Sequence, residues 1–190
     1  MSFEFVLLLV VIIAFGVLLF KTKKQLKSSR EGSALLADIA QEQRDTLRHG
    51  LYQRFKRSGD ESKEDPFDFE YFVADLLTSV NESDVYVTKK SGDIGVDVEE
   101  RREDGLYLYQ VKCEENPIGY EPVAILHSRV VKDGAEGGCV VTTSTFTAAA
   151  VSYAKAVNVE LVDGDGLLEL WEDALAMKKA SARELIPDAI

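Results

Sequence analysis

The sequence predicts an α/β domain with a mixed central sheet flanked by helices, preceded by a transmembrane helix and a helical stalk. Three observations lead to this prediction. Strand-like and helix-like segments alternate from Pro66 onward, which is typical of a sheet covered by helices on both faces. A charged turn joins two neighbouring strand-like segments, and such a hairpin makes the sheet mixed rather than wholly parallel. A long uncharged apolar run, Phe5–Phe20, stands near the N-terminus.

The N-terminal apolar run predicts an uncleaved membrane anchor over residues 1–22. Phe5–Phe20 contains no charge and no proline, and Glu4 and Lys21 flank it at nearly the length that a spanning helix needs. A secretory signal peptide would carry its positive charges before the run, whereas here the lysines follow it. Because basic residues stay on the cytoplasmic side, we expect a single-pass protein of the cell membrane with a cytoplasmic C-terminal domain.

Residues 23–65 predict a polar helical stalk and hinge. Apolar residues recur at roughly helical spacing from Ser33 to Arg57, but the heptads are too few and irregular for a coiled coil. The following segment, Ser58–Asp65, has the polar composition of a flexible hinge. The anchor and stalk would therefore hold the domain at a distance from the membrane.

The domain is expected over residues 66–176, and a polar tail over residues 177–190. Its pattern predicts helix, three strands, helix, strand, helix, strand and helix, in that order. The predicted ranges are Pro66–Ser79, Asp84–Thr88, Val96–Glu100, Leu106–Lys112, Val123–Val131, Gly138–Thr143, Thr145–Asn158, Val159–Val162 and Asp165–Ala174.

Local signals support these elements in turn. Pro66 suits the first turn of a helix, and Asp133-Gly134 suits the end of one. The turn RREDG separates the second and third strands. Gly138–Thr143 is small, β-branched and uncharged, as in a buried strand. The alanines of Thr145–Asn158 would let that helix pack closely on the sheet.

Three polar residues of the predicted hairpin form the candidate site. Gln110 and Lys112 face the same side of one strand because side chains two positions apart do so. The paired strand begins at Asp97, so a carboxylate, an amide oxygen and an ammonium can share one pocket. Hard oxygen ligands suit Mg²⁺, and a lysine can stabilise developing negative charge. The combination predicts phosphodiester hydrolysis.

A purely structural interpretation of the same residues is also open. Asp97 follows a glycine-containing turn and can be a turn residue, and Gln110 and Lys112 can lie on a solvated strand face. The apolar neighbours Leu106, Leu108 and Val111 instead indicate a largely buried strand. A buried lysine is uncommon unless it is paired, and paired lysines gather at functional sites.

Five segments match a known pattern in the same order along the chain. They are Phe69-Glu70, the turn and strand SGDIGVDV (Ser91–Val98), the strand YQVKC (Tyr109–Cys113), and the downstream segments Val140–Lys155 and Val159–Leu170. Together they make the stretch from Pro66 to Glu172 resemble the Mrr-like branch of the restriction-endonuclease (PD-(D/E)xK) superfamily. The resemblance implies a restriction-endonuclease-like fold and a type IV restriction-like DNA endonuclease.

The same resemblance implies roles for individual residues. It makes Asp97 and Gln110 ligands of Mg²⁺ or Mn²⁺, Lys112 the catalytic lysine and Glu70 an accessory acid, with Asp93 a weaker candidate. The sequence departs from the pattern at Ile94, where the family usually has glycine. This departure changes the freedom of the turn but leaves Asp97 in place.

The charge of the domain argues against a simple nuclease. Residues 66–176 contain eight lysines and arginines and twenty-two aspartates and glutamates, a difference of −14. DNA affinity depends on neutralising phosphates, and the dense basic group of this domain is limited to Lys89, Lys90, Arg101 and Arg102.

Two main functions therefore stay open. The first is a membrane-anchored, metal-dependent endonuclease that cleaves DNA, with foreign DNA as the target that the resemblance suggests. The alternative is a catalytically inactive nuclease-fold module that acts as a membrane-tethered interaction scaffold. RNA cleavage is a weaker third option because no platform of paired aromatic residues is evident. A homodimer and a protein partner are both compatible with the sequence.

Overall fold

The computed structural model describes residues 3–56, 66–88 and 95–185, without the side chains of residues 3–20, 24, 28, 29, 66, 184 and 185. Contacts divide the chain into two compact units, Met1–Gln43 and Arg44–Ile190. The predicted hinge at Ser58–Asp65 lies outside the described residues.

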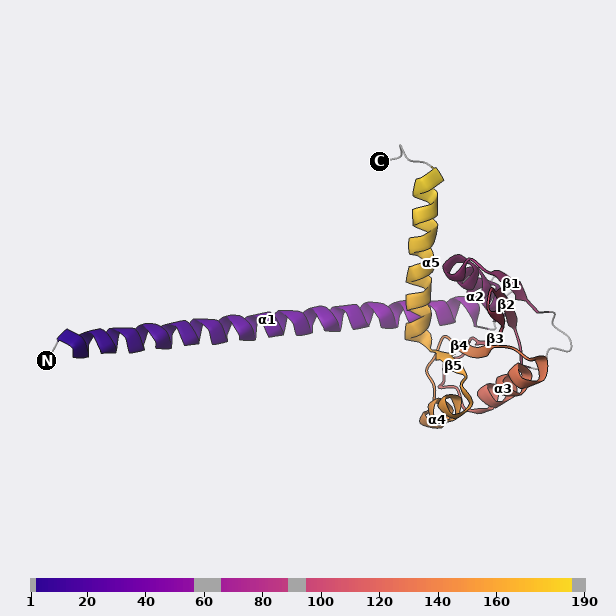
Figure 1. Ribbon diagram of the computed structural model, residues 1–190, viewed down its shortest axis with the longest axis horizontal. Helices are drawn as coiled ribbons and strands as arrows, with labels where there is room; N and C mark the ends of the chain where they lie inside the picture. The colour runs from indigo at the N-terminus through magenta and orange to yellow at the C-terminus, as the bar shows by residue number, and fades with distance from the viewer. Residues whose placement is uncertain (1–2, 57–65, 89–94, 186–190) are drawn as a thin grey trace. The chain divides into compact units, whose positions relative to one another are not determined.

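The first unit belongs to helix α1, which runs from Phe3 to Phe55 (Figure 1). The side chains of the predicted anchor Phe5–Phe20 lie outside the described part of the chain. Among the residues that are described, no helix has both the length and the apolar character needed to cross a membrane. In the first part of the predicted stalk, the apolar side chains of Leu35, Leu36 and Ile39 are exposed.

The second unit contains a mixed sheet of five strands in the order β1-β2-β3-β4-β5. Strands β1 to β3 pair antiparallel, and β3, β4 and β5 pair parallel. The strands are β1 (Asp84–Val87), β2 (Val98–Arg102), β3 (Gly105–Lys112), β4 (Gly137–Thr142) and β5 (Glu160–Val162). The predicted mixed α/β class and its hairpin are confirmed, with Val98 of β2 opposite Tyr109 of β3.

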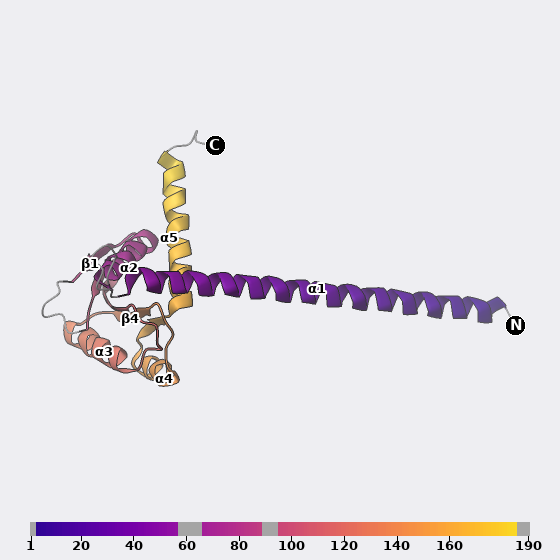
Figure 2. The same ribbon diagram turned by 180° about the vertical axis from the view of Figure 1, so that it is seen from behind.

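Helices cover both faces of this sheet. Helices α2 and α5 lie on one face, and α3 and α4 lie on the other (Figures 1 and 2). The helices are α2 (Pro66–Asn81), α3 (Glu121–Asp133), α4 (Ala148–Val157) and α5 (Gly164–Leu185). Strand β3 shows both faces at once: Tyr109 and Val111 belong to the core beneath α2 and α5, and Leu108 belongs to the core beneath α3 and α4.

The end of α1 is part of the larger core. Leu51 and Phe55 are buried there, and the ring of Phe55 lies 5.3 Å from those of both Phe69 and Phe72. The ring of Phe72 meets Trp171 of α5 edge to face at 5.8 Å. The last turns of the predicted stalk are therefore a structural part of the compact unit that begins at Arg44.

Helix α5 is longer than the sequence predicts. It continues from Gly164 to Leu185, through residues expected to form a polar tail. Its outer part stays beside α2, because Lys178 pairs with Asp75. The sequence does not predict this extension, because its residues are mostly polar and exposed and lack a helical pattern of apolar residues.

Candidate active site

Asp97 lies directly before β2 and is fixed to the neighbouring strands by its backbone. Its N–H donates to the carbonyl of Tyr109 at 2.8 Å, and its own carbonyl accepts from the N–H of Thr88 at 2.9 Å. Its side chain is anchored as well, since Oδ2 accepts from the N–H of Val111 at 2.7 Å. The carboxylate of Asp97 therefore sits against the residue between Gln110 and Lys112.

Gln110 is buried on the α3 side of β3. Its side chain is 5% exposed, and Oε1 is buried without a hydrogen-bond partner in the part of the chain that the structure describes. A Cβ added at Gly95 would lie 3.8 Å from Nε2 of Gln110 and 2.2 Å from Cγ2 of Ile125. Gly95, which has φ +76, and Ile125 of α3 therefore enclose this amide.

Lys112 ends β3 on the same side of the strand as Gln110, because the two are two residues apart. The residue is half-buried, and its carbonyl accepts from the N–H of Thr143 at 3.2 Å. Over the described ranges its ammonium forms no ion pair. The hairpin therefore places the Asp97 carboxylate on the backbone of Val111, between the two residues Gln110 and Lys112, which share one side of β3.

The donor set at this place fits a divalent metal ion. Buried polar atoms in folded proteins nearly always have a partner, so the lone Oε1 of Gln110 requires an explanation. A cation held by this amide oxygen and the carboxylate of Asp97 would supply one, with water completing the coordination. Among the described residues no group of three or more His, Cys, Asp and Glu could hold a metal. A metal at this site would therefore depend on the amide and on water.

Glu70 is less closely placed. It lies half-buried in α2, and α2 covers the sheet face opposite to that of Gln110. Asn81, at the end of α2, donates to Glu100, so the first turns of α2 point toward the end of β3 that carries Lys112. Asp93 and Ile94 lie outside the described residues.

A buried carboxylate that the sequence did not single out holds the other end of the hairpin. Glu100 is 0% exposed and accepts hydrogen bonds from Asn81, Ser83, Arg102 and Tyr109. Burial opposes its ionisation, but the hydrogen bonds, led by that from Arg102, hold the pKa of Glu100 below its ordinary value. Burial and the hydrogen bond to this carboxylate raise the pKa of the Tyr109 phenol.

The Glu100 network has a role in positioning. It ties β2 to Tyr109 of β3, and the backbone of Tyr109 in turn binds that of Asp97. In the sequence Glu100 belongs to the charged run VEERR, which reads as a solvated strand end. Nothing in that pattern distinguishes a buried glutamate from its exposed neighbours.

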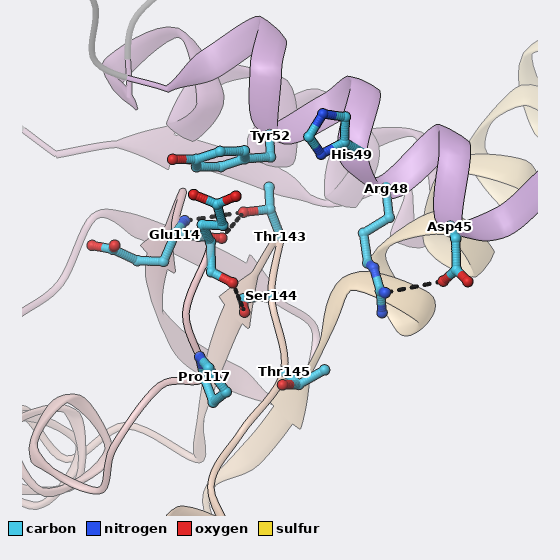
Figure 3. A pocket seen from close by; sticks show the side chains of 10 residues that line it. Asp45, Arg48, His49, Tyr52, Glu114, Pro117, Thr143, Ser144 and Thr145 are labelled. Atoms are coloured by element: carbon cyan, nitrogen blue, oxygen red, sulfur yellow. Dashed lines mark hydrogen bonds and ion pairs between the residues drawn. The ribbon is translucent and has the colours of Figure 1, made fainter.

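A pocket of about 280 Å³ opens at the carboxyl ends of β3 and β4 (Figure 3). The end of α1 contributes Arg48, His49 and Tyr52 to its wall, and residues after the two strands complete it. The sequence does not predict this pocket, because the α1 residues in its wall have the pattern of a helical stalk.

Comparisons with known proteins agree with the fold. A family model described as "Restriction endonuclease" (Mrr_cat) matches residues 61–171. The solved structure of the DNA modification-dependent restriction endonuclease AspBHI is similar with a TM-score of 0.53 and 21% identity, over 73% of this chain and 40% of that one. The MspJI restriction endonuclease in complex with a 27-mer oligonucleotide gives a TM-score of 0.50 and 17% identity, over 76% of this chain and 36% of that one.

The chain thus spans well under half the length of either solved structure. At these identities the likeness shows a shared fold. A search of curated proteins gave no match.

Proposed function

The chain belongs to the restriction endonuclease family whose model matches residues 61–171, and from that membership we propose that it is a metal-dependent endonuclease acting on DNA. Its fold is similar to that of AspBHI, a DNA modification-dependent restriction endonuclease, and to that of MspJI, which was solved with an oligonucleotide. Both similarities support DNA as the substrate. More specifically, we propose that it restricts foreign DNA in the manner of a type IV restriction endonuclease.

The observation that carries the proposal is the arrangement around Val111. The N–H of Val111 holds the carboxylate of Asp97, while its two neighbours, Gln110 and Lys112, lie on the opposite side of the strand from the Val111 side chain. The support for one shared site is that a carboxylate, an amide oxygen without a partner among the described residues and a half-buried lysine belong to neighbouring positions of the hairpin. Structural roles alone do not explain a buried amide oxygen without a partner.

Each residue has a distinct task in this proposal. Asp97 and Gln110 would hold Mg²⁺ or Mn²⁺, which supplies a Lewis acid for the phosphate and lowers the pKa of water. Lys112 stabilises the negative charge that develops on the phosphate. Glu70 is an accessory acid that would act from the first turns of α2. The hydrogen bond from Val111 keeps the Asp97 carboxylate oriented without neutralising it.

A cleavage assay tests this function. The full chain in detergent is incubated with plasmid or linear duplex DNA and with Mg²⁺ or Mn²⁺. We expect Asp97→Asn and Lys112→Ala to lower the rate by about 10² to 10³. Asp173→Asn and Lys155→Ala, at exposed positions of α5 and α4, are the matched controls and should cut like wild type. Calorimetric titration should show that Asp97→Asn loses the metal while Lys112→Ala keeps it.

A second function has one observation in its favour. The domain carries a charge of −14 from eight basic and twenty-two acidic residues between positions 66 and 176, which opposes DNA binding. A membrane-tethered interaction scaffold with an inactive nuclease fold would tolerate such a surface. Wild-type protein that binds no metal and cuts no DNA or RNA substrate would favour the scaffold over the enzyme.

We also propose that Phe5–Phe20 anchors the protein in the cell membrane with its domain in the cytoplasm. Support comes from the uncharged run and from the lysines and arginine that follow it. The protein should remain with membranes after alkaline extraction, and protease added to the outside of intact cells should leave the domain uncut. Recovery of the full chain in the soluble fraction would contradict the anchor.

A further inference from the structure

The pocket at the carboxyl ends of β3 and β4 takes no part in the chemistry proposed above. Figure 3 shows side chains of α1 on one side of it and residues that follow the strands on the other. Ligands of open α/β sheets bind in the crevice outside the carboxyl ends of the strands. The pocket has that position.

Hydrogen bonds connect the pocket wall to the proposed active site. Thr143, which lines the pocket, donates from its N–H to the carbonyl of Lys112 at 3.2 Å. The hydroxyl of Thr143 also accepts from the N–H of Glu114 at 3.0 Å and donates to the carbonyl of Glu114 at 2.8 Å. The wall that carries Glu114 is therefore rigidly joined to the end of the strand that carries Lys112.

The charge of the lining excludes phosphate as the natural occupant. Asp45, Glu114 and Glu115 are acidic and Arg48 is basic, a formal difference of −2. Arg48 is already engaged, since its guanidinium lies 3.0 Å from Asp45 and 3.9 Å from Asp165. Burial, followed by the charge of Glu115 and a hydrogen bond from the Tyr52 hydroxyl to that carboxylate, raises the pKa of Tyr52. The pocket therefore favours groups that donate hydrogen bonds.

Aromatic rings provide the remaining wall. Tyr52 and His49 lie one turn apart on α1, above the strand ends in Figure 3. Gln53 lies 3.2 Å from Nε2 of His49 and can hold that ring in place. Aromatic side chains stack on nucleobases whatever their sequence, and carboxylates accept from exocyclic amines such as N4 of cytosine. A volume of about 280 Å³ suits one base rather than a duplex.

We propose that this pocket binds one unpaired, amine-bearing nucleobase of DNA, such as cytosine, next to the phosphate that is cleaved. Tyr52 stacks on the base, and Glu115 accepts from its amine. Because a paired base cannot reach the pocket, the nucleotide must leave the helical stack or come from single-stranded DNA. This inference rests on the proposed function and adds a subsite that recognises the state of one base.

Fluorescence anisotropy with the full chain in detergent tests the subsite, with Ca²⁺ replacing Mg²⁺ to prevent cleavage. The probes are three labelled duplexes that differ at one position: fully paired, with an extrahelical cytosine, or with an extrahelical thymine. We expect the cytosine probe to bind about fivefold to a hundredfold more tightly than the paired duplex. The thymine probe, which lacks the exocyclic amine, should gain less.

Variants separate stacking from recognition of the amine. Tyr52→Leu should abolish the preference for an extrahelical base, whereas Tyr52→Phe and the exposed control Tyr71→Leu should retain it. Glu115→Gln should reduce the preference for cytosine over thymine, and Glu172→Gln on α5 should not. Because Glu115 is exposed in a loop, its variant tests the proposal even if Tyr52→Leu fails to fold.

The outcomes distinguish this subsite from the proposed function. Equal affinity for all three probes, with plasmid cleavage that still depends on Asp97, would overturn the subsite and leave the endonuclease intact. A thymine probe that binds as well as the cytosine probe would also overturn it. Wild-type protein that binds no DNA and cuts none would overturn both proposals.

Discussion

At the scale of single residues, Gly95 controls the space around the candidate metal ligand Gln110. Its φ of +76 is unfavourable for residues with a side chain, and an added Cβ would lie only 2.2 Å from Cγ2 of Ile125. We expect Gly95→Ala to lower the stability by about 1 to 3 kcal/mol and to weaken metal binding, because α3 must move. Urea denaturation and calorimetric Mn²⁺ titration measure the two effects.

The matched control for this prediction is the double variant Gly95→Ala with Ile125→Ala. Removing the Ile125 side chain eliminates the clash but not the backbone strain, so the double variant should recover part of the lost stability and most of the metal affinity. Recovery of neither would show that the enclosure by Ile125 is unimportant. Gly134→Ala, at φ +65 with open space around it, reports the strain alone.

The buried carboxylate of Glu100 predicts a pH dependence of stability. The pKa of Glu100 is lowered in the folded protein, so the carboxylate stabilises the fold above the ordinary pKa of a glutamate, roughly 4.3. This contribution is lost as the pH falls through the folded pKa. Glu100→Gln should therefore cost about 1 to 3 kcal/mol at pH 7 and less near pH 3.

Urea denaturation of wild type and Glu100→Gln at both pH values checks this dependence. Glu99→Gln, at the neighbouring position of β2 on the opposite face, is the control and should shift neither midpoint by much. A difference between wild type and Glu100→Gln that is the same at both pH values would contradict an ionised Glu100.

At the scale of elements, local patterns predicted most of the sheet. The alternation of Leu106–Lys112 and the charged turn before it specify a hairpin without reference to the rest of the chain. The extension of α5 and the packing of the α1 end were missed for one reason. Both depend on contacts between distant segments, such as Lys178 with Asp75, which no local window contains.

In the candidate site too, local features are predictable from the sequence and contacts between distant segments are not. Spacing along β3 places Gln110 and Lys112 on one face, and the hairpin predicts Asp97 near them. The anchoring of Asp97 by the N–H of Val111 is not predictable, because it depends on where β2 begins. The wall of the nucleobase pocket is harder still, since Tyr52 precedes Glu115 by more than sixty residues.

The packing of α1 yields a prediction about where the stable unit begins. A fragment that starts at Arg44 retains Leu51 and Phe55, whereas one that starts at Pro66 loses both from the core. Phe55→Ala in the longer fragment should cost about 3 to 5 kcal/mol, and the shorter fragment should be less stable still. In the full chain, Leu36→Ala at a 70% exposed position is the control and should change stability by less than about 0.5 kcal/mol.

Thermal unfolding of the two fragments measures this difference. Equal midpoints for the fragments that start at Arg44 and at Pro66 would show that the end of α1 contributes nothing to the domain. If the fragment that starts at Pro66 is as stable as the longer one but inactive, the role of the α1 end is to form the pocket wall.

At the scale of the whole molecule, the acidic surface predicts an unusual response to salt. A DNA-binding protein that makes six to ten phosphate contacts loses about 10³ to 10⁵ in affinity between 50 and 200 mM salt. Between positions 44 and 190, seventeen basic residues are outnumbered by twenty-nine acidic ones, so this part of the chain can make few such contacts. We expect its affinity for duplex DNA to fall by less than about tenfold over that range.

Anisotropy titrations of the Arg44–Ile190 fragment at the two salt concentrations check this expectation, and they exclude the basic segment that follows Phe5–Phe20. The full chain, which retains that segment, should show a steeper dependence. A steep dependence in the fragment itself would indicate a phosphate-binding surface that the composition does not suggest.

The joining of Phe55 to Trp171 through Phe72 also has a consequence during protein synthesis. The core needs Leu167 and Leu168 of α5, which leave the ribosome more than a hundred residues after Phe55. At about 5 to 20 residues per second, the end of α1 waits on the order of ten seconds for the helix that completes its core. A nascent chain that already holds Asp97, Gln110 and Lys112 would therefore be unable to cut DNA until α5 has been synthesised.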